Sequence, residues 1–181
     1  LVAVNNLNGS QGFEEYEMKT MTKIKEKDFG SGVVSSLKYY SNSTLIGIKT
    51  LDGVKSVFLF DLNKSQLKEI YKTNKNIGWP SKVGNRLVFS VKKNDFEEIV
   101  CVNLETKEIY MVTETQLGNY YPSVNKNKIV FSSMGNNGFD IYTSSFEEMV
   151  SVLDYSQNIE PILKEQNKKQ SNYKTQKNNP L

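Results

Sequence analysis

Short apolar runs separated by polar turns follow one another along most of the chain. Residues 57–62 (VFLFDL) and 99–104 (IVCVNL) are almost continuously apolar and rich in β-branched and aromatic side chains. Runs of this kind, bounded by turn residues, predict strands that are buried on both faces. Residues 108–113 (EIYMVT) alternate instead, which predicts a strand with one face in water. The pattern therefore predicts an all-β chain.

The apolar runs recur at a constant spacing. Residues 129–132 (IVFS) follow residues 87–90 (LVFS) by 42 residues, and the two buried runs named above are separated by the same distance. A third landmark agrees, because residues 121–123 (YPS) follow residues 79–81 (WPS) by 42 residues as well. Three landmarks that share one period indicate a repeat architecture.

Each copy of the repeat is predicted to contain four strands. Three copies are clear, at about residues 33–72, 79–113 and 121–146, and residues 1–28 follow the same plan loosely. A period of about 42 residues with four strands per unit is typical of a β-propeller blade. We therefore expect a β-propeller of four-stranded antiparallel blades, with three clear blades and a partial one.

The composition changes near the end of the chain. Residues 164–181 hold five lysines and one acidic residue, and they contain few apolar side chains. We expect residues 1–163 to form the propeller and residues 164–181 to be a basic, polar and disordered tail. Contact of this tail with nucleic acid or with an anionic surface is the alternative to a solvated end, and we do not expect it.

Several chemistries are excluded by the residue types present. The chain has no histidine, which excludes Ser/His and Cys/His nucleophiles and imidazole metal sites. Cys101 is the single cysteine, so no internal disulfide or thiolate cluster can form, and its place between Val100 and Val102 predicts a buried side chain. We expect no metal, no cofactor and no catalytic residue.

No apolar run is long enough to predict a membrane span. Leu1 is not an initiator residue, so we expect a processed protein or an excised piece, with any targeting signal upstream.

Aromatic side chains are the candidate binding residues. In a propeller the first strand of each blade lines the central channel, and the repeat spacing assigns Trp79, Tyr120 and Tyr121 to the loops leading into that strand. Tyr39 and Tyr40 are their expected counterparts in the first clear copy. A ring of aromatics at a channel mouth could hold a peptide or a sugar by stacking. The alternative is that these rings wedge between blades as part of the core.

Acidic residues give weaker signals. Asp140, Glu98 and Ser56 share one position of the repeat, where we expect hydrogen bonds that hold a turn rather than an ion site. Adjacent pairs such as residues 97–98 point to opposite faces of a strand, so they do not predict a catalytic carboxylate pair.

The repeat resembles that of the TolB-like propeller family, which includes WD-like blades. Residues 121–123 (YPS), 129–133 (IVFSS) and 140–142 (DIY) fit the family pattern closely, whereas Gly47 and Ser56 depart from it in the first clear copy. The resemblance covers about residues 33–146. The family includes a periplasmic protein and the propeller domains of prolyl-oligopeptidase-like and tricorn-like peptidases. It is specific for fold and uninformative about chemistry.

The resemblance implies a non-catalytic binding module outside the cytoplasm, at the cell surface, in the periplasm or secreted. Such a module would present its channel rim to a protein or carbohydrate partner. The alternative is the gating domain of a larger peptidase. A lyase or hydrolase acting within the propeller is disfavoured by the missing histidines.

Blade number is open at this point. Family members usually close with six or seven blades, which need more residues than this chain has. The chain is therefore either part of a larger propeller or a small ring closed by residues 158–163 beside residues 1–4. An incomplete propeller would expose apolar blade faces, so we expect it to associate with another copy or with further chain.

Overall fold

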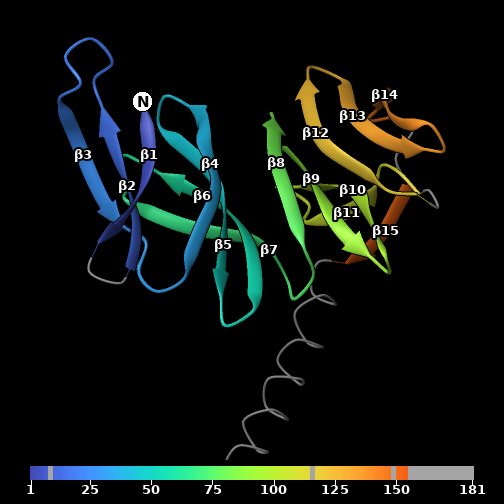
Figure 1. Ribbon diagram of the computed structural model, residues 1–181, viewed down its shortest axis with the longest axis horizontal. Helices are drawn as coiled ribbons and strands as arrows, with labels where there is room; N and C mark the ends of the chain where they lie inside the picture. Colours follow the sequence, from blue (N-terminus) through green and yellow to red (C-terminus); the bar gives the residue numbers. More distant parts are fainter. Residues whose placement is uncertain (8–9, 115–116, 148–149, 155–181) are drawn as a thin grey trace, which may run out of the picture.

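The computed structural model describes residues 1–7, 10–114, 117–147 and 150–154, and Figure 1 shows its course. All regular structure in these residues is β-strand, arranged in four antiparallel sheets. The all-β prediction is therefore confirmed. The predicted tail, residues 164–181, and the strand proposed at residues 158–163 lie outside the described residues.

The first two sheets come from the first half of the chain. Sheet A has three strands in the order β1 (Val2–Leu7), β2 (Ser10–Tyr16) and β3 (Lys23–Asp28). Sheet B has four strands in chain order, namely β4 (Val33–Ser41), β5 (Thr44–Leu51), β6 (Val54–Asp61) and β7 (Gln66–Thr73).

Sheets C and D come from the second half. The meander of sheet C is β8 (Ile77–Val83), β9 (Arg86–Lys93), β10 (Phe96–Asn103) and β11 (Glu108–Met111). Sheet D is β12 (Asn119–Asn125), β13 (Lys128–Gly135) and β14 (Gly138–Ser145). A last strand, β15 (Val150–Asp154), pairs with β11 and makes sheet C five-stranded.

The strand pairing confirms the repeat. Val57, Ile99 and Ile141 lie on the third strands of their copies, opposite Ile48, Ser90 and Ser132 of the second strands. Both sets are spaced by 42 residues. One prediction needs correction at the end of the third copy. Each copy was predicted to contain four strands, but β15, which follows β14, completes the edge of sheet C and leaves sheet D with three strands among the described residues.

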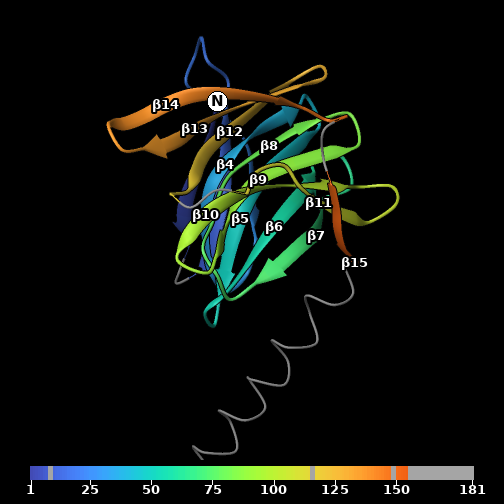
Figure 2. The same ribbon diagram turned by 90° about the vertical axis from the view of Figure 1, so that its right-hand side faces the viewer.

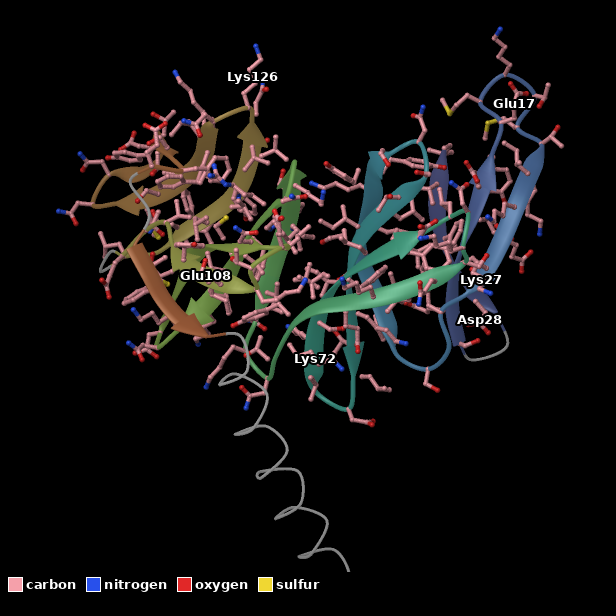
Figure 3. All side chains as sticks on the ribbon, turned by 180° about the vertical axis from the view of Figure 1, so that it is seen from behind. Glu17, Lys27, Asp28, Lys72, Glu108 and Lys126 are labelled. Carbon is pink, nitrogen blue, oxygen red and sulfur yellow. The ribbon has the colours of Figure 1, made fainter. Side chains whose placement is uncertain are left out.

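The sheets stack in chain order, from sheet A at one end to sheet D at the other (Figures 1 and 2). The innermost strand of each copy lies against the preceding sheet: β12 contacts β8, β9 and β10, and β4 contacts β1 and β2. Among the described residues no strand pairs on the inner side of β1, so β1 corresponds to β5 and β9. Charged residues such as Lys27, Lys72 and Glu108 lie on β3, β7 and β11, the last strands of their meanders (Figure 3), as the alternating pattern predicted.

Apolar clusters fill the spaces between successive sheets. Between sheets A and B the buried residues are Phe13, Phe29, Val34, Leu45, Phe58, Phe60 and Leu62. The cluster between sheets B and C is the largest, and it includes Ile46, Ile48, Val57, Leu87, Phe89, Val100 and Val102. Sheets C and D enclose Val88, Ile99, Cys101, Ile129, Phe131 and Phe146. Each fully buried aliphatic or aromatic side chain stabilises the fold by about 1.5–3 kcal/mol.

One departure from the repeat has a packing explanation. Gly47 pairs with Phe58 across β5 and β6, whereas the second copy pairs Phe89 with Val100 at the same place. A Cβ atom on Gly47 would lie 2.8 Å from Cζ of Phe58. The large side chain is therefore on the third strand in the first clear copy and on the second strand in the next copy. Phe58 fills the volume that Phe89 fills in the second copy.

This exchange predicts strong coupling between Gly47 and Phe58. Gly47→Phe should destabilise the fold by at least about 3 kcal/mol because two rings would occupy one space. Phe58→Val should cost about 2–4 kcal/mol by leaving a cavity. The double variant copies the second repeat and should recover about 2 kcal/mol or more relative to the sum of the single changes. Urea unfolding followed by circular dichroism measures all three.

Gly135→Ala is the control, because the nearest atom to an added Cβ there, the carbonyl oxygen of Gly138, lies 3.7 Å away. We expect a change below about 0.5 kcal/mol for this variant. Additive single changes at Gly47 and Phe58 would show that the two side chains do not share one volume.

The single cysteine lies in the core, as predicted. Cys101 is fully buried between sheets C and D. Burial raises the pKa of its thiol to about 12, because the thiolate is poorly solvated there. The buried thiol is therefore a packing group in the folded protein.

The raised pKa predicts slow reaction of Cys101 with iodoacetamide. At pH 8 only about one thiol in 10⁴ is ionised when its pKa is about 12, whereas a substantial fraction is ionised at the ordinary pKa. Mass spectrometry should show no alkylation of the native protein and complete alkylation in denaturant. Rapid labelling of native protein would contradict the burial of this side chain.

Candidate functional site

Each of the three innermost strands contains a β-bulge at the same place. The bulge residue has a positive φ in all three, with values of 53°, 52° and 55° for Ser36, Trp79 and Tyr121. Pairing resumes beyond each bulge at Lys38, Ser81 and Ser123, opposite Ile46, Val88 and Val130. The bulge is therefore part of the repeat, and the side chain that it carries varies from copy to copy.

In sheets C and D this variable side chain is a large aromatic exposed to solvent. Trp79 and Tyr121 are 53% and 52% exposed, and their ring centroids lie 5.1 Å apart in an edge-to-face arrangement. Tyr120 continues the row, with its centroid 6.1 Å from that of Tyr121 and 5.7 Å from that of Phe139. We call Trp79, Tyr121, Tyr120 and Phe139 the aromatic arc.

The structure brings together three of the five aromatics that the sequence singled out. Trp79, Tyr120 and Tyr121 lie within β8 and β12, not in loops leading into them, because these strands begin earlier than the pattern indicated. Tyr39 and Tyr40 lie beyond the bulge of β4, so the counterpart of Trp79 in sheet B is Ser36. The expected equivalence of Tyr39 and Tyr40 with Trp79 is therefore not present.

Tyr39 and Tyr40 make separate contacts. The hydroxyl of Tyr39 donates a hydrogen bond to Oε1 of Glu15 at 2.7 Å, and the pKa of Tyr39 is raised to about 12 by burial and by this carboxylate. Nζ of Lys82 lies 3.6 Å from the ring centroid of Tyr40, a cation–π contact between sheets C and B. Both rings are only about one third exposed, at 37% and 36%. These contacts connect neighbouring sheets.

A carboxylate lies beside the aromatic arc. Oε2 of Glu97 accepts a hydrogen bond from Oγ of Ser90 at 2.7 Å, and it would lie 3.7 Å from a Cβ atom on Gly78, the neighbour of Trp79. The pKa of Tyr120 is raised by burial first and then by the negative charges of Glu97 and Glu98. The arc therefore combines aromatic faces with a hydrogen-bond acceptor of negative charge.

The side chain of Glu98 lies on the face of β10 opposite to that of Glu97, and its hydrogen bonds link sheet C to sheet D. It is 3% exposed, and Oε2 accepts hydrogen bonds from Oγ1 of Thr113 at 2.6 Å and from Nδ2 of Asn119 at 2.8 Å. We expected this position to hold a turn, and instead it binds the start of β12. Glu97 and Glu98 have different partners, which agrees with the prediction that they do not form a carboxylate pair.

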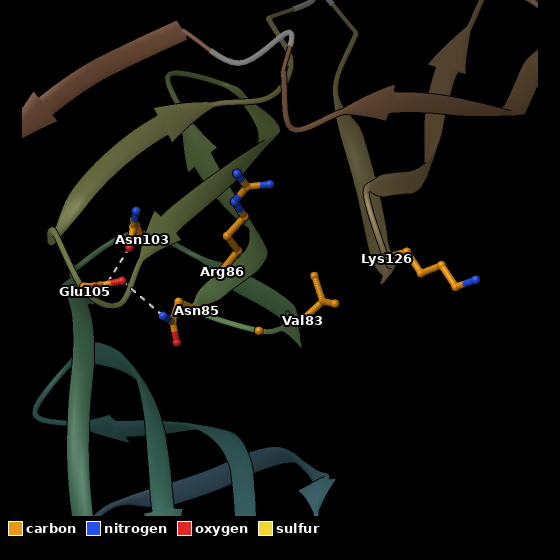
Figure 4. A pocket seen from close by; sticks show the side chains of 7 residues that line it. Val83, Asn85, Arg86, Asn103, Glu105 and Lys126 are labelled. Atoms are coloured by element: carbon orange, nitrogen blue, oxygen red, sulfur yellow. Dashed lines mark hydrogen bonds between the residues drawn. The ribbon is translucent and has the colours of Figure 1, made fainter.

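A separate pocket lies at the turns of sheets C and D (Figure 4). Its volume is about 370 Å³, and its walls are Val83, Gly84, Asn85, Arg86, Asn103, Glu105 and Lys126. Arg86 is the single arginine of the chain, and its guanidinium carbon lies 4.4 Å from the ring centroid of Phe146. The carboxylate of Glu105 accepts a hydrogen bond from Asn85 at 3.2 Å. A bound anion would be repelled by this carboxylate, so the mixed charges of the pocket walls do not indicate one class of ligand.

Among the described residues, no group of three His, Cys, Asp or Glu side chains is placed to hold a metal ion. In the same part of the chain, no helix has the length and apolar character needed to cross a membrane.

Two members of the candidate site were missed by sequence reasoning. Phe139 follows Gly138 in the β13–β14 hairpin, and the matching residues in the other copies are Glu97 and Lys55, so the repeat gave no signal for an aromatic there. Glu97 itself was considered only as one of a pair. A correct cross-strand register would have identified Phe139, because it places Phe139 and Tyr120 on one face of sheet D.

Comparison with known proteins supports the fold. No family of known sequences and no curated protein matches the chain. The solved structure of TolB from Acinetobacter baumannii is similar with a TM-score of 0.62 and 12% identity, over 83% of this chain and 41% of that one. A puromycin-hydrolyzing peptidase of Mycobacterium tuberculosis is similar with a TM-score of 0.61 and 8% identity, over 81% of this chain and 25% of that one.

A chain of the nidogen–laminin complex is similar as well, with a TM-score of 0.53 and 14% identity, over 79% of this chain and 57% of that one. The chain thus spans less than two thirds of each of these three structures. At these identities the likeness shows fold alone. Four sheets stacked by their innermost strands, together with these neighbours, show that the chain has a β-propeller-type fold.

Proposed function

We propose that this chain is a non-catalytic propeller module that binds a protein or carbohydrate partner at the aromatic arc. One observation carries the proposal: Trp79 and Tyr121 contact each other and are still about half exposed, at 53% and 52%. Large aromatics that stay exposed on a rigid sheet are typical of binding surfaces, because they offer contact area at low cost in side-chain entropy.

The backbone conformation supports the proposal. A bulky residue with positive φ costs of order 1–3 kcal/mol, and glycine or asparagine would relieve that cost. Ser36 shows that the repeat does not require an aromatic at the bulge. The presence of Trp79 and Tyr121 at two successive bulges is therefore not explained by folding, and binding is the explanation we favour.

The chemistry of the arc indicates what the partner must present. The exposed ring faces favour the apolar face of a sugar or a peptide side chain, and a positively charged group would also be attracted to them. Glu97 adds an acceptor for hydroxyl or ammonium groups. The partner would therefore combine a flat or apolar surface with hydrogen-bond donors.

The structural neighbours are consistent with this proposal at the level of fold. We further propose that the chain belongs to the TolB-like propeller repeat family and works outside the cytoplasm, on the basis of the repeat motifs and the likeness to TolB. The laminin complex of nidogen is an example of a similar chain in a protein–protein complex.

A second candidate function is the gating domain of a larger peptidase, which the likeness to the puromycin-hydrolyzing peptidase favours. The two functions differ in whether the full polypeptide contains an activated serine. A fluorophosphonate probe should leave the polypeptide unlabelled if it is a binding module alone, and covalent labelling would favour the peptidase.

Glycine substitutions test the aromatic arc without straining the backbone. Trp79→Gly and Tyr121→Gly should keep or slightly raise the free energy of unfolding, since glycine tolerates a positive φ. Each should weaken binding of a glycan or peptide identified by array screening by at least about tenfold, the usual effect of removing an important interface aromatic. Isothermal titration calorimetry measures the affinity.

Ser36→Gly is the matched control, because it changes the equivalent bulge of sheet B and should leave affinity unchanged. Trp79 is the single tryptophan of the chain, so its fluorescence reports directly on occupancy of the arc in the unchanged protein. Unchanged affinity in both glycine variants, or binding without any change in Trp79 emission, would contradict the proposed site.

A further inference from the structure

The two rings at the centre of the aromatic arc meet at an angle. The planes of Trp79 and Tyr121 are inclined at 71°, with the edge of one ring directed at the face of the other. Both side chains are about half exposed, so part of each ring surface is open to a ligand. A flat ligand contacts two rings best when they share one plane, whereas rings set at an angle surround a compact cation, as in aromatic cages for ammonium groups. The angle therefore favours a cation.

A carboxylate supplies negative charge beside these two rings. Oε2 of Glu97 would lie 3.7 Å from a Cβ atom on Gly78, the residue that precedes Trp79. On the other side, burial first and then the charge of Glu97 raise the pKa of Tyr120, the residue that precedes Tyr121. Glu97 thus lies near the neighbours of both rings. A cation held by the ring faces would also be attracted to this carboxylate.

The ring and the carboxylate occur together in sheet C and are both missing from sheet B. Ser36 and Lys55 hold the positions of Trp79 and Glu97 there. Nζ of Lys55 donates a hydrogen bond to the side chain of Asn76 at 2.6 Å, so this position carries the opposite charge. Stacking of the sheets therefore requires neither group, and a shared ligand explains why they occur in the same sheet.

The chain places cations over other rings, away from the aromatic arc. Lys82 lies 3.6 Å from the ring centroid of Tyr40, and Arg86 lies 4.4 Å from that of Phe146. Within the described ranges, no lysine or arginine makes such a contact with a ring of the arc. These faces are therefore available to a cation from a partner.

Glu97 is available as well. Lys92 is its cross-strand partner in β9, but none of the ion pairs among the described residues includes Glu97. Its carboxylate accepts the hydrogen bond from Ser90 and keeps further lone pairs for a ligand.

We propose that the aromatic arc binds a lysine side chain of a protein partner, with the ammonium group held by the ring faces of Trp79 and Tyr121 and paired with Glu97. This inference rests on the proposed function and specifies the chemistry of the partner. It favours a protein over a carbohydrate, because a neutral sugar gains nothing from the charge of Glu97.

The emission of Trp79, the single tryptophan, measures binding of defined probes to the 181-residue chain. An acetylated and amidated Gly-Lys-Gly-Lys-Gly peptide should change this emission in a saturable way. The same peptide with both lysines acetylated should bind at least about tenfold more weakly, because acetylation removes the ammonium charge. Cellotetraose, which presents flat sugar faces without charge, should also bind at least about tenfold more weakly than the lysine peptide.

Glu97→Gln removes the charge and keeps an acceptor for the hydroxyl of Ser90. It should weaken binding of the lysine peptide by at least about fivefold and leave binding of the acetylated peptide unchanged. Glu147→Gln is the matched control, because it removes the same charge beside the turn that follows β12, where Glu147 accepts a hydrogen bond from Asn127 at 3.0 Å. This variant should bind the lysine peptide like the unchanged protein.

The outcomes separate this inference from the proposed function. The lysine site would be refuted, and the arc would remain a binding surface, if the acetylated peptide or cellotetraose bound as tightly as the lysine peptide. Full affinity of the Glu97→Gln variant for the lysine peptide would have the same meaning. Unchanged emission of Trp79 with all three probes would refute both the lysine site and the aromatic arc as a binding surface.

Discussion

Burial of apolar sheet faces between neighbouring sheets is the constraint on which this structure depends. A three- or four-stranded sheet with apolar faces is unstable in water by itself; sheets B and C are covered on both faces by their neighbours, and sheets A and D on one. The innermost strands contribute most directly, because β8 and β12 each lie across the first three strands of the sheet before them, and β4 lies across β1 and β2. The positions that face the next sheet must therefore be apolar in every copy, which is why Phe13, Val57 and Ile99 coincide.

This requirement leaves little freedom in the core and more freedom along the innermost strands. Their bulges recur in all three strands, so the backbone shape belongs to the stacking geometry. The side chain at the bulge points away from the clusters, and it can change from Ser36 to Trp79 or Tyr121 without disturbing them. Binding chemistry can be placed there because packing does not decide the residue. The same reasoning explains why Gly47 and Phe58 have the small and the large side chain in the reverse order from the second copy. The core fixes the total volume of the pair and not which of the two strands carries the larger residue.

The sequence predicted the parts of the fold that follow from local periodicity. Equal spacing of residues 57–62 and 99–104 correctly predicted equivalent central strands, and the place of Cys101 between two valines predicted its burial. Pairing between distant strands was less accessible. Nothing in the pattern of residues 150–154 distinguishes the edge of sheet D from that of sheet C, because both offer the same backbone groups. Tyr39 and Tyr40 were misaligned with Trp79 because a bulge shifts the register within a strand, and aromatic content alone does not show such a shift.

Glu98 has a consequence for the order of the sheets. Its carboxylate joins Thr113 to Asn119 at the start of β12, and the residues in the same place are Ser56 in sheet B and Gly12 in sheet A. The hydroxyl of Ser56 donates to the carbonyl oxygen of Lys49 at 3.4 Å and to Oε1 of Glu69 at 2.9 Å, both within sheet B, so the contact made by Glu98 distinguishes the junction of sheets C and D. If a different sheet packed on sheet C, this buried carboxylate would lose the hydrogen bond from Asn119, at a cost of about 1–3 kcal/mol. One polar contact can in this way prevent similar repeats from being shuffled during folding.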